Sequence, residues 1–309
     1  MGDESELYAF NYSGFPGAES APTRRSATSD PLAVRIALIT VAFLFLGLFL
    51  FLPVIAVFIE ALRKGTGEYF AAISNAETLS AIRLTLMTAA IAVPLNVSFG
   101  LAAAWAITRF EFRGKQLLVT LIDIPFSVSP VIAGMLFVLL LGVRTPIGAW
   151  LYDHGIKTIF AEPGIVLATI FVTFPLAARQ LIPIMQAVGS EEEQAAIVLG
   201  AGGWQSFLRI TIPNVKWGLL YGLVLCNARA MGEFGAVSVV SGHVRGYTNT
   251  MPLYVEILYN DYQFAAAFAV SSLLTLLAIA TLVAKRCLEG RVAPVKKFEQ
   301  DVPENKAAA

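Results

Sequence analysis

The chain has 309 residues, of which 57% are hydrophobic and 14% are charged, and its mean hydropathy is +0.70. This composition is far more apolar than that of soluble globular proteins and indicates a membrane protein. Lys and Arg number 22, as do Asp and Glu, so the net charge of zero gives no support to a nucleic acid partner.

Residues 1–31 are expected to form a disordered cytoplasmic tail. They mix acidic, Gly, Pro, Ser and Thr residues without apolar periodicity. They do not resemble a secretory signal, because the chain begins acidic and its first long apolar run starts only at Pro31.

Six segments then read as transmembrane helices, since a helix needs about 20 residues to cross the hydrocarbon of a bilayer. They are Ile36–Ile59, Leu84–Thr108, Leu117–Val143, Gly164–Val188, Pro213–Gly242 and Phe264–Ala284. The predicted fold class is an all-α membrane protein with six transmembrane helices. Residues 32–286 would form the membrane domain, and residues 287–309 a second cytoplasmic tail.

Basic residues fall unevenly on the two sides of this topology. If the N-terminus is cytoplasmic, most Lys and Arg lie on the cytoplasmic side, as the positive-inside rule requires. The opposite side receives only Arg63, Lys64, Arg144, Lys157 and Arg245. Both termini are therefore predicted to be cytoplasmic, and so is the connection formed by residues 190–213.

That connection predicts two short helices separated by a glycine joint. Ser190 and Glu193 have the spacing of a capping box, which predicts a helix start. Apolar periodicity stops at Gly200 and resumes at Trp204, and Pro213 is expected to end the second helix and begin the fifth span.

Two interpretations of this helix pair are open. It could lie among lipid headgroups, or it could offer its apolar and small residues to a protein. Helices of the first kind are rich in Lys and Arg, whereas this pair contains Arg209 alone and three consecutive glutamates. The sequence therefore favours a protein partner.

Here the sequence resembles the EAA loop of ABC-importer permease subunits, whose pattern is Glu-Ala-Ala, three residues, Gly, nine residues, Ile, one residue, Leu-Pro. The spacing agrees throughout, but Gln194 replaces the family's Glu, with Glu193 just before it, and Ile212 replaces Leu. The resemblance implies a coupling helix that docks into a cleft on an ATP-hydrolysing subunit. The residues it assigns to this role are Glu193, Gln194, Ala195, Ala196, Gly200, Ile210 and Pro213.

Two further segments narrow the resemblance. The segments "LIDIPFSVSPVIAGM" (residues 121–135) and "NARAMGEFGAVSVVSG" (residues 227–242) are similar to the sulfate/thiosulfate permeases, and most similar to their W-type half. Molybdate and tungstate permeases remain an alternative. The resemblance implies a type I ABC importer permease fold (MetI-like) in a bacterial inner membrane.

The same resemblance implies a set of partners and a division of labour. The partners would be a T-type permease subunit or a second copy of this chain, two copies of an ATP-binding subunit and an extracytoplasmic sulfate/thiosulfate-binding protein. ATP and Mg would bind to the ATPase, because this chain contains no Gly-x-x-x-x-Gly-Lys-Ser/Thr phosphate loop. The chain is therefore expected to be a transport subunit and to bind no cofactor itself.

Charged residues in the fifth span are candidates for an anion path. Arg229 and Glu233 are spaced i and i+4, which predicts one helix face and an ion pair. Either they neutralise each other as a structural pair, or Arg229 and Asn227 attract an anion while Glu233 keeps it from binding too tightly.

The third span adds two hydroxyl candidates, Ser127 and Ser129, between Pro125 and Pro130. The prolines would free backbone carbonyls, which is tolerated beside protein or a cavity. The hydroxyls could donate to sulfate, or bond back to carbonyls of their own helix, which is the commoner arrangement. Asp123 could pair with an Arg of the partner subunit or cap the kink.

Other functions fit the sequence less well. A secondary anion transporter would show inverted repeats, and no convincing repeat relates the two halves. A membrane enzyme would need a cluster of His, Cys or carboxylates at a plausible depth. Cys226 and Cys287 have no metal-ligand spacing, and His154 and His243 are isolated, so neither a catalytic nor a metal site is expected.

Overall fold

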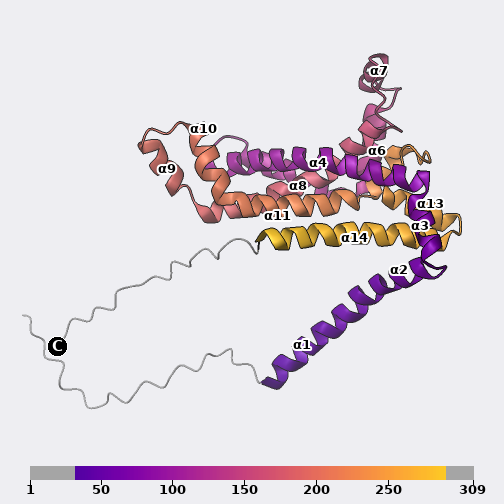
Figure 1. The fold of residues 1–309 in the computed structure, drawn as a ribbon. Helices are drawn as coiled ribbons and strands as arrows, with labels where there is room; N and C mark the ends of the chain where they lie inside the picture. Colours follow the sequence, from indigo (N-terminus) through magenta and orange to yellow (C-terminus); the bar gives the residue numbers. More distant parts are fainter. Residues whose placement is uncertain (1–31, 290–309) are drawn as a thin grey trace, which may run out of the picture. The chain divides into compact units, whose positions relative to one another are not determined.

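The structure is a computed structural model that describes residues 32–289 (Figure 1). The predicted tail 1–31 lies outside the described residues, as does the predicted C-terminal tail from residue 290 onward. Residues 287–289, which were assigned to that tail, instead complete the last helix, α14 (Phe264–Glu289). Within residues 32–289 the elements are helices and no strand occurs, which confirms the all-α prediction.

The described residues divide into two units, with the boundary between Val54 and Ile55. The first unit holds α1 (Leu32–Leu46), the π-helix η1 (Gly47–Phe51) and the start of α2 (Leu52–Leu62). These helices run on as one stretch of 31 residues that is long and apolar enough to cross a membrane. The stretch contains the whole of the first predicted span.

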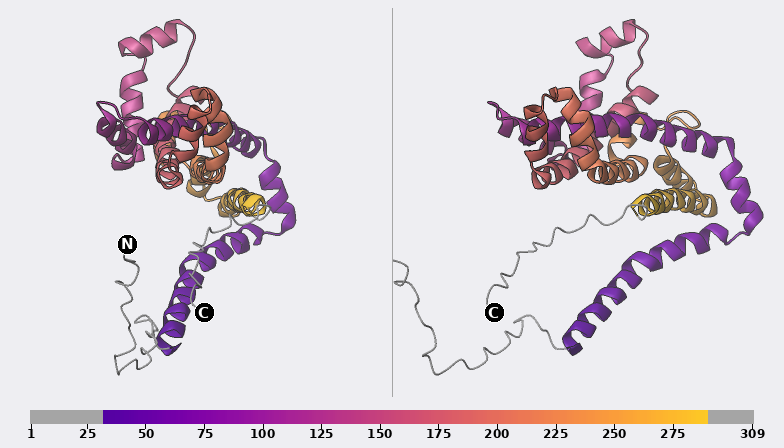
Figure 2. Two further views of the ribbon diagram at one scale, coloured as in Figure 1. Left: turned by 90° about the vertical axis from the view of Figure 1, so that its left-hand side faces the viewer. Right: turned by 60° about the vertical axis from the view of Figure 1, so that its left-hand side comes forward.

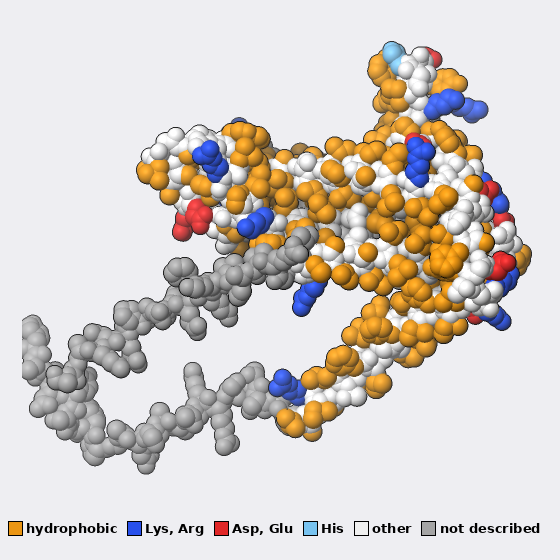
Figure 3. All heavy atoms as spheres, viewed as in Figure 1, with side chains coloured by type: hydrophobic (Ala, Val, Ile, Leu, Met, Phe, Trp, Pro, Cys, Tyr) orange, Lys and Arg blue, Asp and Glu red, His pale blue; other side chains and the backbone are white. Residues whose placement is uncertain are grey.

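Four long helices build the second unit. They are α4 (Ala76–Arg109), α8 (Glu162–Val188), α11 (Ile212–Met231) and α14, which lie side by side in Figures 1 and 2. Their core contains Ala89, Ala177, Cys226 and Met231. Apolar side chains cover much of the lateral surface of this bundle (Figure 3), as expected of a surface that faces lipid.

Small residues let α4 and α8 approach closely. A Cβ placed on Gly100 of α4 would lie 2.5 Å from the Ala177 Cβ and 2.8 Å from the Ala178 backbone nitrogen. No side chain fits in that space, so the two helices meet backbone to backbone. This contact fixes α4 and α8 to each other over the middle of the bundle.

Two of the six predicted spans are broken. Helix α5 (Lys115–Ser127) and α6 (Pro130–Leu141) meet at an angle of 106°. The helical stretch Gly203–Met231 and α12 (Gly235–Ser241) meet at 50°. The first break lies between Pro125 and Pro130, where the sequence predicted freed carbonyls and a kink. Ser129, directly before Pro130, has ψ 136°, the extended conformation that a following proline favours.

The other four spans are continuous helices, with some ends shifted from the prediction. Helix α4 starts at Ala76, eight residues before the predicted Leu84, because Asn75 caps it by accepting a hydrogen bond from Glu77 N at 3.3 Å. Helix α8 passes through Pro175 and Pro183 without a break.

Short helices gather at the two ends of the long ones (Figure 1). One end carries α9 (Glu191–Val198), α10 (Gly203–Ser206) and the π-helix η2 (Phe207–Thr211). The other end carries α3 (Thr66–Ser74) and α13 (Met251–Asn260), and α7 (Pro146–Asp153) follows α6. Connections predicted to share a side of the membrane thus share an end of the bundle.

The close contact at Gly100 generates the first prediction. Gly100→Ala should destabilise the protein by about 1–3 kcal/mol, because the added methyl group overlaps backbone atoms that cannot move aside. Gly67→Ala is the matched control, since Gly67 is also helical and nothing lies within 4 Å of its added Cβ. Thermal unfolding in detergent measures both variants. Equal midpoints would contradict the close contact.

Candidate functional site

The candidate site is centred on α9, a helix that packs only loosely against the rest of the chain. None of its eight residues is buried. It follows directly from the end of α8 through Gly189, and it ends where Gly200, at φ +90°, turns the chain toward α10. The predicted pair of helices with a glycine joint is therefore present.

One buried ion pair ties α9 to the long helices. The Nε of Arg109, the last residue of α4, lies 2.8 Å from a carboxylate oxygen of Glu193 on α9. Only 8% of the Arg109 side chain and 13% of the Glu193 side chain are exposed. Little water reaches the pair, so screening weakens it less than it would a surface pair.

The remaining bonds of this pair reach two more elements. Arg109 also donates to the main-chain oxygens of Met185, at 3.1 Å, and Gly189, which lie at the end of α8. The second oxygen of Glu193 accepts a hydrogen bond of 2.7 Å from Thr211 in η2. We call Arg109, Glu193 and Thr211 the clamp, because together they join α4, α8, α9 and η2.

The outward surface of this region is strongly apolar. Val198 and Leu199 are 85% and 88% exposed, and Ile197 and Trp204 are exposed beside them. A contiguous set of such residues on a surface helix marks a protein interaction site more often than a free surface. Ala195 and Gly200 are also exposed, so the small residues of the EAA pattern accompany this patch.

Two details of the sequence prediction at this loop are wrong. Ser190 precedes α9 but makes no capping hydrogen bond; its hydroxyl accepts from Gln194 instead, at 2.8 Å, because Glu193 is taken by the clamp. Pro213 does not end a helix. The chain runs through η2 into α11, and Ile212 N bonds to the oxygen of Phe207, five residues back, which accommodates the proline.

A cavity of about 260 Å³ lies against α9, α10 and the end of α4. Its aromatic walls are Trp105, Phe110 and Phe207, and the clamp lies along its lining. Trp105 Nε1 and Ser206 Oγ are buried there without a hydrogen-bond partner among the described residues. The space beneath α9 is thus hollow rather than packed.

Arg229 and Glu233 form the ion pair that the sequence predicted. They do not share the face of one helix, however. Arg229 Nη1 lies 2.8 Å from Glu233, at an angle that is not that of a hydrogen bond. Helix α11 ends at Met231, so Glu233 lies in the bend before α12, where its other oxygen accepts from Ala236 N at 3.0 Å. Glu233 therefore joins both sides of the bend.

Exposure differs sharply between the two charges. The Glu233 side chain is 1% exposed, whereas that of Arg229 is 41% exposed. Asn227, one turn before Met231, directs its amide nitrogen to the Met231 sulfur at 3.4 Å. The carboxylate is thus held inside, and the guanidinium remains reachable from outside the chain.

The two helix breaks lie against each other. A Cβ on Gly235 would be 3.0 Å from the Pro130 Cβ, so the start of α12 contacts the start of α6. The break therefore brings Ser129 to the same region as Glu233. Ser127 and Ser129 are exposed, and within residues 32–289 neither hydroxyl bonds back to its helix, so the commoner arrangement expected from sequence is absent.

Asp123 pairs within this chain rather than capping the kink. Arg179 of α8 donates from its Nε to Asp123 at 2.7 Å, and its guanidinium lies 4.3 Å above the Phe126 ring. These contacts attach α5 to α8 just before the break.

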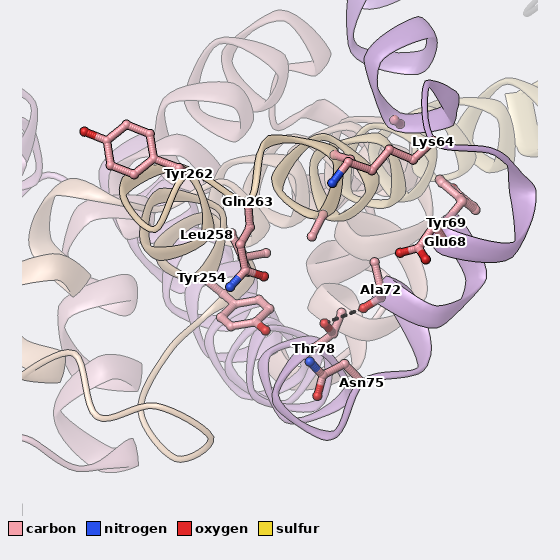
Figure 4. Close-up of a pocket in the computed structure, with 13 residues that line it drawn as sticks. Lys64, Glu68, Tyr69, Ala72, Asn75, Thr78, Tyr254, Leu258, Tyr262 and Gln263 are labelled. Carbon is pink, nitrogen blue, oxygen red and sulfur yellow. Dashed lines mark hydrogen bonds between the residues drawn. The ribbon is translucent and has the colours of Figure 1, made fainter.

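A polar pocket of about 250 Å³ lies at the opposite end of the bundle (Figure 4). In that view Lys64, Glu68, Tyr254 and Gln263 surround it. Burial raises the pKa of the Tyr254 hydroxyl, which keeps it protonated.

The described residues contain no group of three or more His, Cys, Asp or Glu side chains that could hold a metal ion. Cys226 is buried and Cys287 is exposed, and both are free. His154 directs its Nδ1 to the main-chain oxygen of Trp150, at 2.7 Å, within its own loop. These side chains form no catalytic arrangement.

Sequence reasoning missed Arg109 as a site residue and counted it only as a cytoplasmic charge. The available signal was its position as the first charge after a long apolar run, on the same predicted side of the membrane as a loop with three glutamates. Its partner could not be read from spacing, because 84 residues separate Arg109 from Glu193.

Comparisons with known proteins agree with this architecture. The family described as "Binding-protein-dependent transport system inner membrane component" matches residues 96–293. "Sulfate transport system permease protein CysW" of Escherichia coli (strain K12) is 49% identical over 263 residues, covering 85% of this chain and 90% of that protein. "Sulfate transport system permease protein CysT" of the same organism is 32% identical over 248 residues, covering 80% and 90%.

A solved structure shows the same fold. It is a bacterial alginate ABC transporter in complex with an alginate pentasaccharide-bound periplasmic protein. One of its chains aligns with a TM-score of 0.71 and 16% identity, covering 84% of this chain and 94% of that chain. At this identity the likeness concerns the fold alone.

The turn at Gly200 generates the second prediction. Gly200→Ala should raise the rate of local opening of α9 at least about fivefold, because a positive φ costs an L-residue roughly 1–2 kcal/mol. Gly202→Ala is the matched control, since Gly202 has φ −69° and nothing lies within 4 Å of its added Cβ. Hydrogen exchange of the α9 amides reports the opening. Equal exchange in the Gly200→Ala and Gly202→Ala variants would refute the requirement for a positive φ at position 200.

Proposed function

Because the chain belongs to the binding-protein-dependent transport system inner membrane components, and among them to the CysW-type sulfate permeases, we propose that it forms half of the anion path of an ATP-driven sulfate/thiosulfate importer. The observation that carries this proposal is the 49% identity to CysW over 85% of the chain. The lower identity of 32% to CysT supports the W-type half over the T-type half. Neither named relative is a molybdate or tungstate permease, so that alternative has less support.

The chain is a multi-pass inner-membrane transport subunit. Its proposed partners are a T-type permease, two copies of an ATPase that binds ATP and Mg, and an extracytoplasmic binding protein. The end that carries α9 and α10 would face the cytoplasm, together with both termini, because most Lys and Arg of the sequence fall on that side. The end that carries α3 and α13 would face the binding protein.

Coupling to the ATPase is proposed for the patch on α9. Val198, Leu199 and Trp204 offer apolar area, while Ala195 and Gly200 allow close approach. Of the EAA residues, Gln194 lies beside this patch, Ala196 is half-buried and Glu193 faces inward to the clamp. Ile210 lies in η2 and Pro213 in the first turn of α11, so both follow the patch along the chain.

The anion path is proposed along the two facing helix breaks. Arg229 supplies an accessible positive charge, and Asn227, Ser127 and Ser129 supply hydrogen-bond donors. Glu233 lowers the net charge near Arg229, so a dianion would bind weakly enough to leave again.

Docking of α9 yields the third prediction. Val198→Asp should abolish co-purification of the ATPase subunit, because the new carboxylate would be buried without a partner at the interface, which costs about 3–5 kcal/mol. Ile156→Asp is the control, since Ile156 is an exposed apolar residue in a loop beyond α7 and outside the patch. Retention of the ATPase by a folded Val198→Asp protein would remove α9 as the docking element.

The fourth prediction separates a path-lining Arg229 from a structural pair. Arg229→Gln with Glu233→Gln removes both charges and leaves no unpaired one. We expect this double variant to assemble with the ATPase and to hydrolyse ATP when the loaded binding protein is present. Sulfate uptake in vesicles should fall at least about tenfold, which corresponds to roughly 1.4 kcal/mol of lost attraction.

The single variant Arg229→Leu is the comparison for that experiment. It leaves the buried Glu233 carboxylate without its partner and should lower assembly itself. Near-normal uptake by the double variant at matched protein level would make the pair structural and would exclude Arg229 from the path.

A further inference from the structure

We infer that Arg109 is the positioning residue through which a movement of α9 reaches the membrane helices. The inference rests on the proposed coupling role of α9 and adds the route by which the coupling helix acts on its own chain. Arg109 lies outside the EAA pattern. In this role it converts a displacement of α9 into a displacement of α4 and α8.

The first argument is the way α9 is attached. None of the residues of α9 is fully buried and Ala196 is only half-buried, so side-chain packing against the long helices is slight and the chain ends and polar bonds of α9 provide most of its attachment. Besides the clamp, α9 has one polar bond to a long helix, from Asn214 Nδ2 to Glu192 at 2.6 Å. That bond is exposed to solvent, whereas the clamp is largely buried.

The second argument is the hollow beside α9. The cavity lined by Trp105, Phe110 and Ile197 separates much of α9 from α4, so a push on α9 cannot pass directly into the bundle there. Arg109 contacts both sides of the gap: its Cα belongs to α4 and its guanidinium holds Glu193 of α9. Arg109 is therefore the side chain that connects α9 to α4 across this cavity.

The third argument is the rigidity of what Arg109 holds. Its guanidinium also binds the main-chain oxygens of Met185 and Gly189 at the end of α8. Helices α4 and α8 already touch backbone to backbone at Gly100, so they are expected to respond as one body. A planar guanidinium with several fixed donors suits this task better than an ammonium group.

The departure from the EAA pattern at Gln194 also supports the role of Arg109. Gln194 occupies the position of the family's Glu, and its amide bonds only to Ser190 of the same loop. Glu193, one residue earlier, is rotated away from the exposed patch and into the clamp. The Glu193 carboxylate thus binds within the chain rather than facing the outer surface.

The test uses the complete complex in proteoliposomes, with sulfate uptake and ATP hydrolysis measured on the same preparation. Arg109→Gln should assemble and hydrolyse ATP, while the amount of sulfate moved per ATP falls at least about tenfold. Arg109→Lys keeps the charge but not the fork of donors, and should give an intermediate ratio. Asn214→Ala is the matched control, and its ratio should equal that of the original protein.

Each outcome decides the inference. If uptake and hydrolysis fall in the same proportion at equal amounts of assembled complex, or if neither falls, Arg109 is only a structural support and the inference is overturned. Should Arg109→Gln fail to assemble, Glu193→Gln decides, because it keeps the shape of the original side chain and one of its two acceptor oxygens while removing the charge. Failure of that variant to assemble also overturns the inference.

The experiment distinguishes this inference from the proposed function. If the complex with the original chain moves no sulfate, the proposed function is wrong irrespective of Arg109. If the original complex moves sulfate and Arg109→Gln keeps the same sulfate-to-ATP ratio, the proposed function stands and the role of Arg109 does not.

Discussion

A helix that fully buries none of its residues gains little from the hydrophobic effect, and α9 is such a helix. Its position depends on the clamp, in which Arg109 binds Glu193 at 2.8 Å in largely buried surroundings. The guanidinium thereby fixes Glu193 of α9 to the ends of α4 and α8, whereas Trp204 of the patch stacks on Phe207 instead. An ion pair at an open surface contributes little to stability. The pair of Arg109 and Glu193 contributes more, because it is shielded from water and few other contacts hold α9.

The two broken spans are the second feature that shapes the bundle. The third and the fifth predicted spans each stop and restart, and the two breaks contact each other at Gly235 and Pro130. Glu233 stabilises one bend by accepting from Ala236 N and by pairing with Arg229. Free backbone groups and charges are thus concentrated in one region, while the rest of the unit presents ordinary apolar helices to the membrane.

Much of this arrangement follows from sequence, for identifiable reasons. Long apolar runs predict spans because the bilayer imposes a length, and the prolines at 125 and 130 predict a break because they lack an amide proton. The glycine joint at Gly200 was likewise readable, since the periodicity stops there. Each of these features depends on residues close together in the chain.

What could not be predicted depends on residues far apart in the chain. The clamp joins Arg109 to Glu193, and this contact removed the capping box that the local pattern favoured at Ser190. The partner of Asp123 also came from another helix, Arg179 of α8. The end of α11 before Glu233 was missed because i and i+4 spacing does not reveal that a helix has already ended.

The π-helix η2 has a consequence for how this loop could have arisen. A π-helical turn carries one residue more than an α-helical turn, and it commonly marks a single inserted residue that the flanking helix has absorbed. Without it, every later residue of α11 would be rotated by about 100°, the angle between successive residues of an α-helix. Val215 and Cys226 would then leave the core. The length of the loop can therefore vary by one residue over evolutionary time while the buried residues of α11 still point into the core.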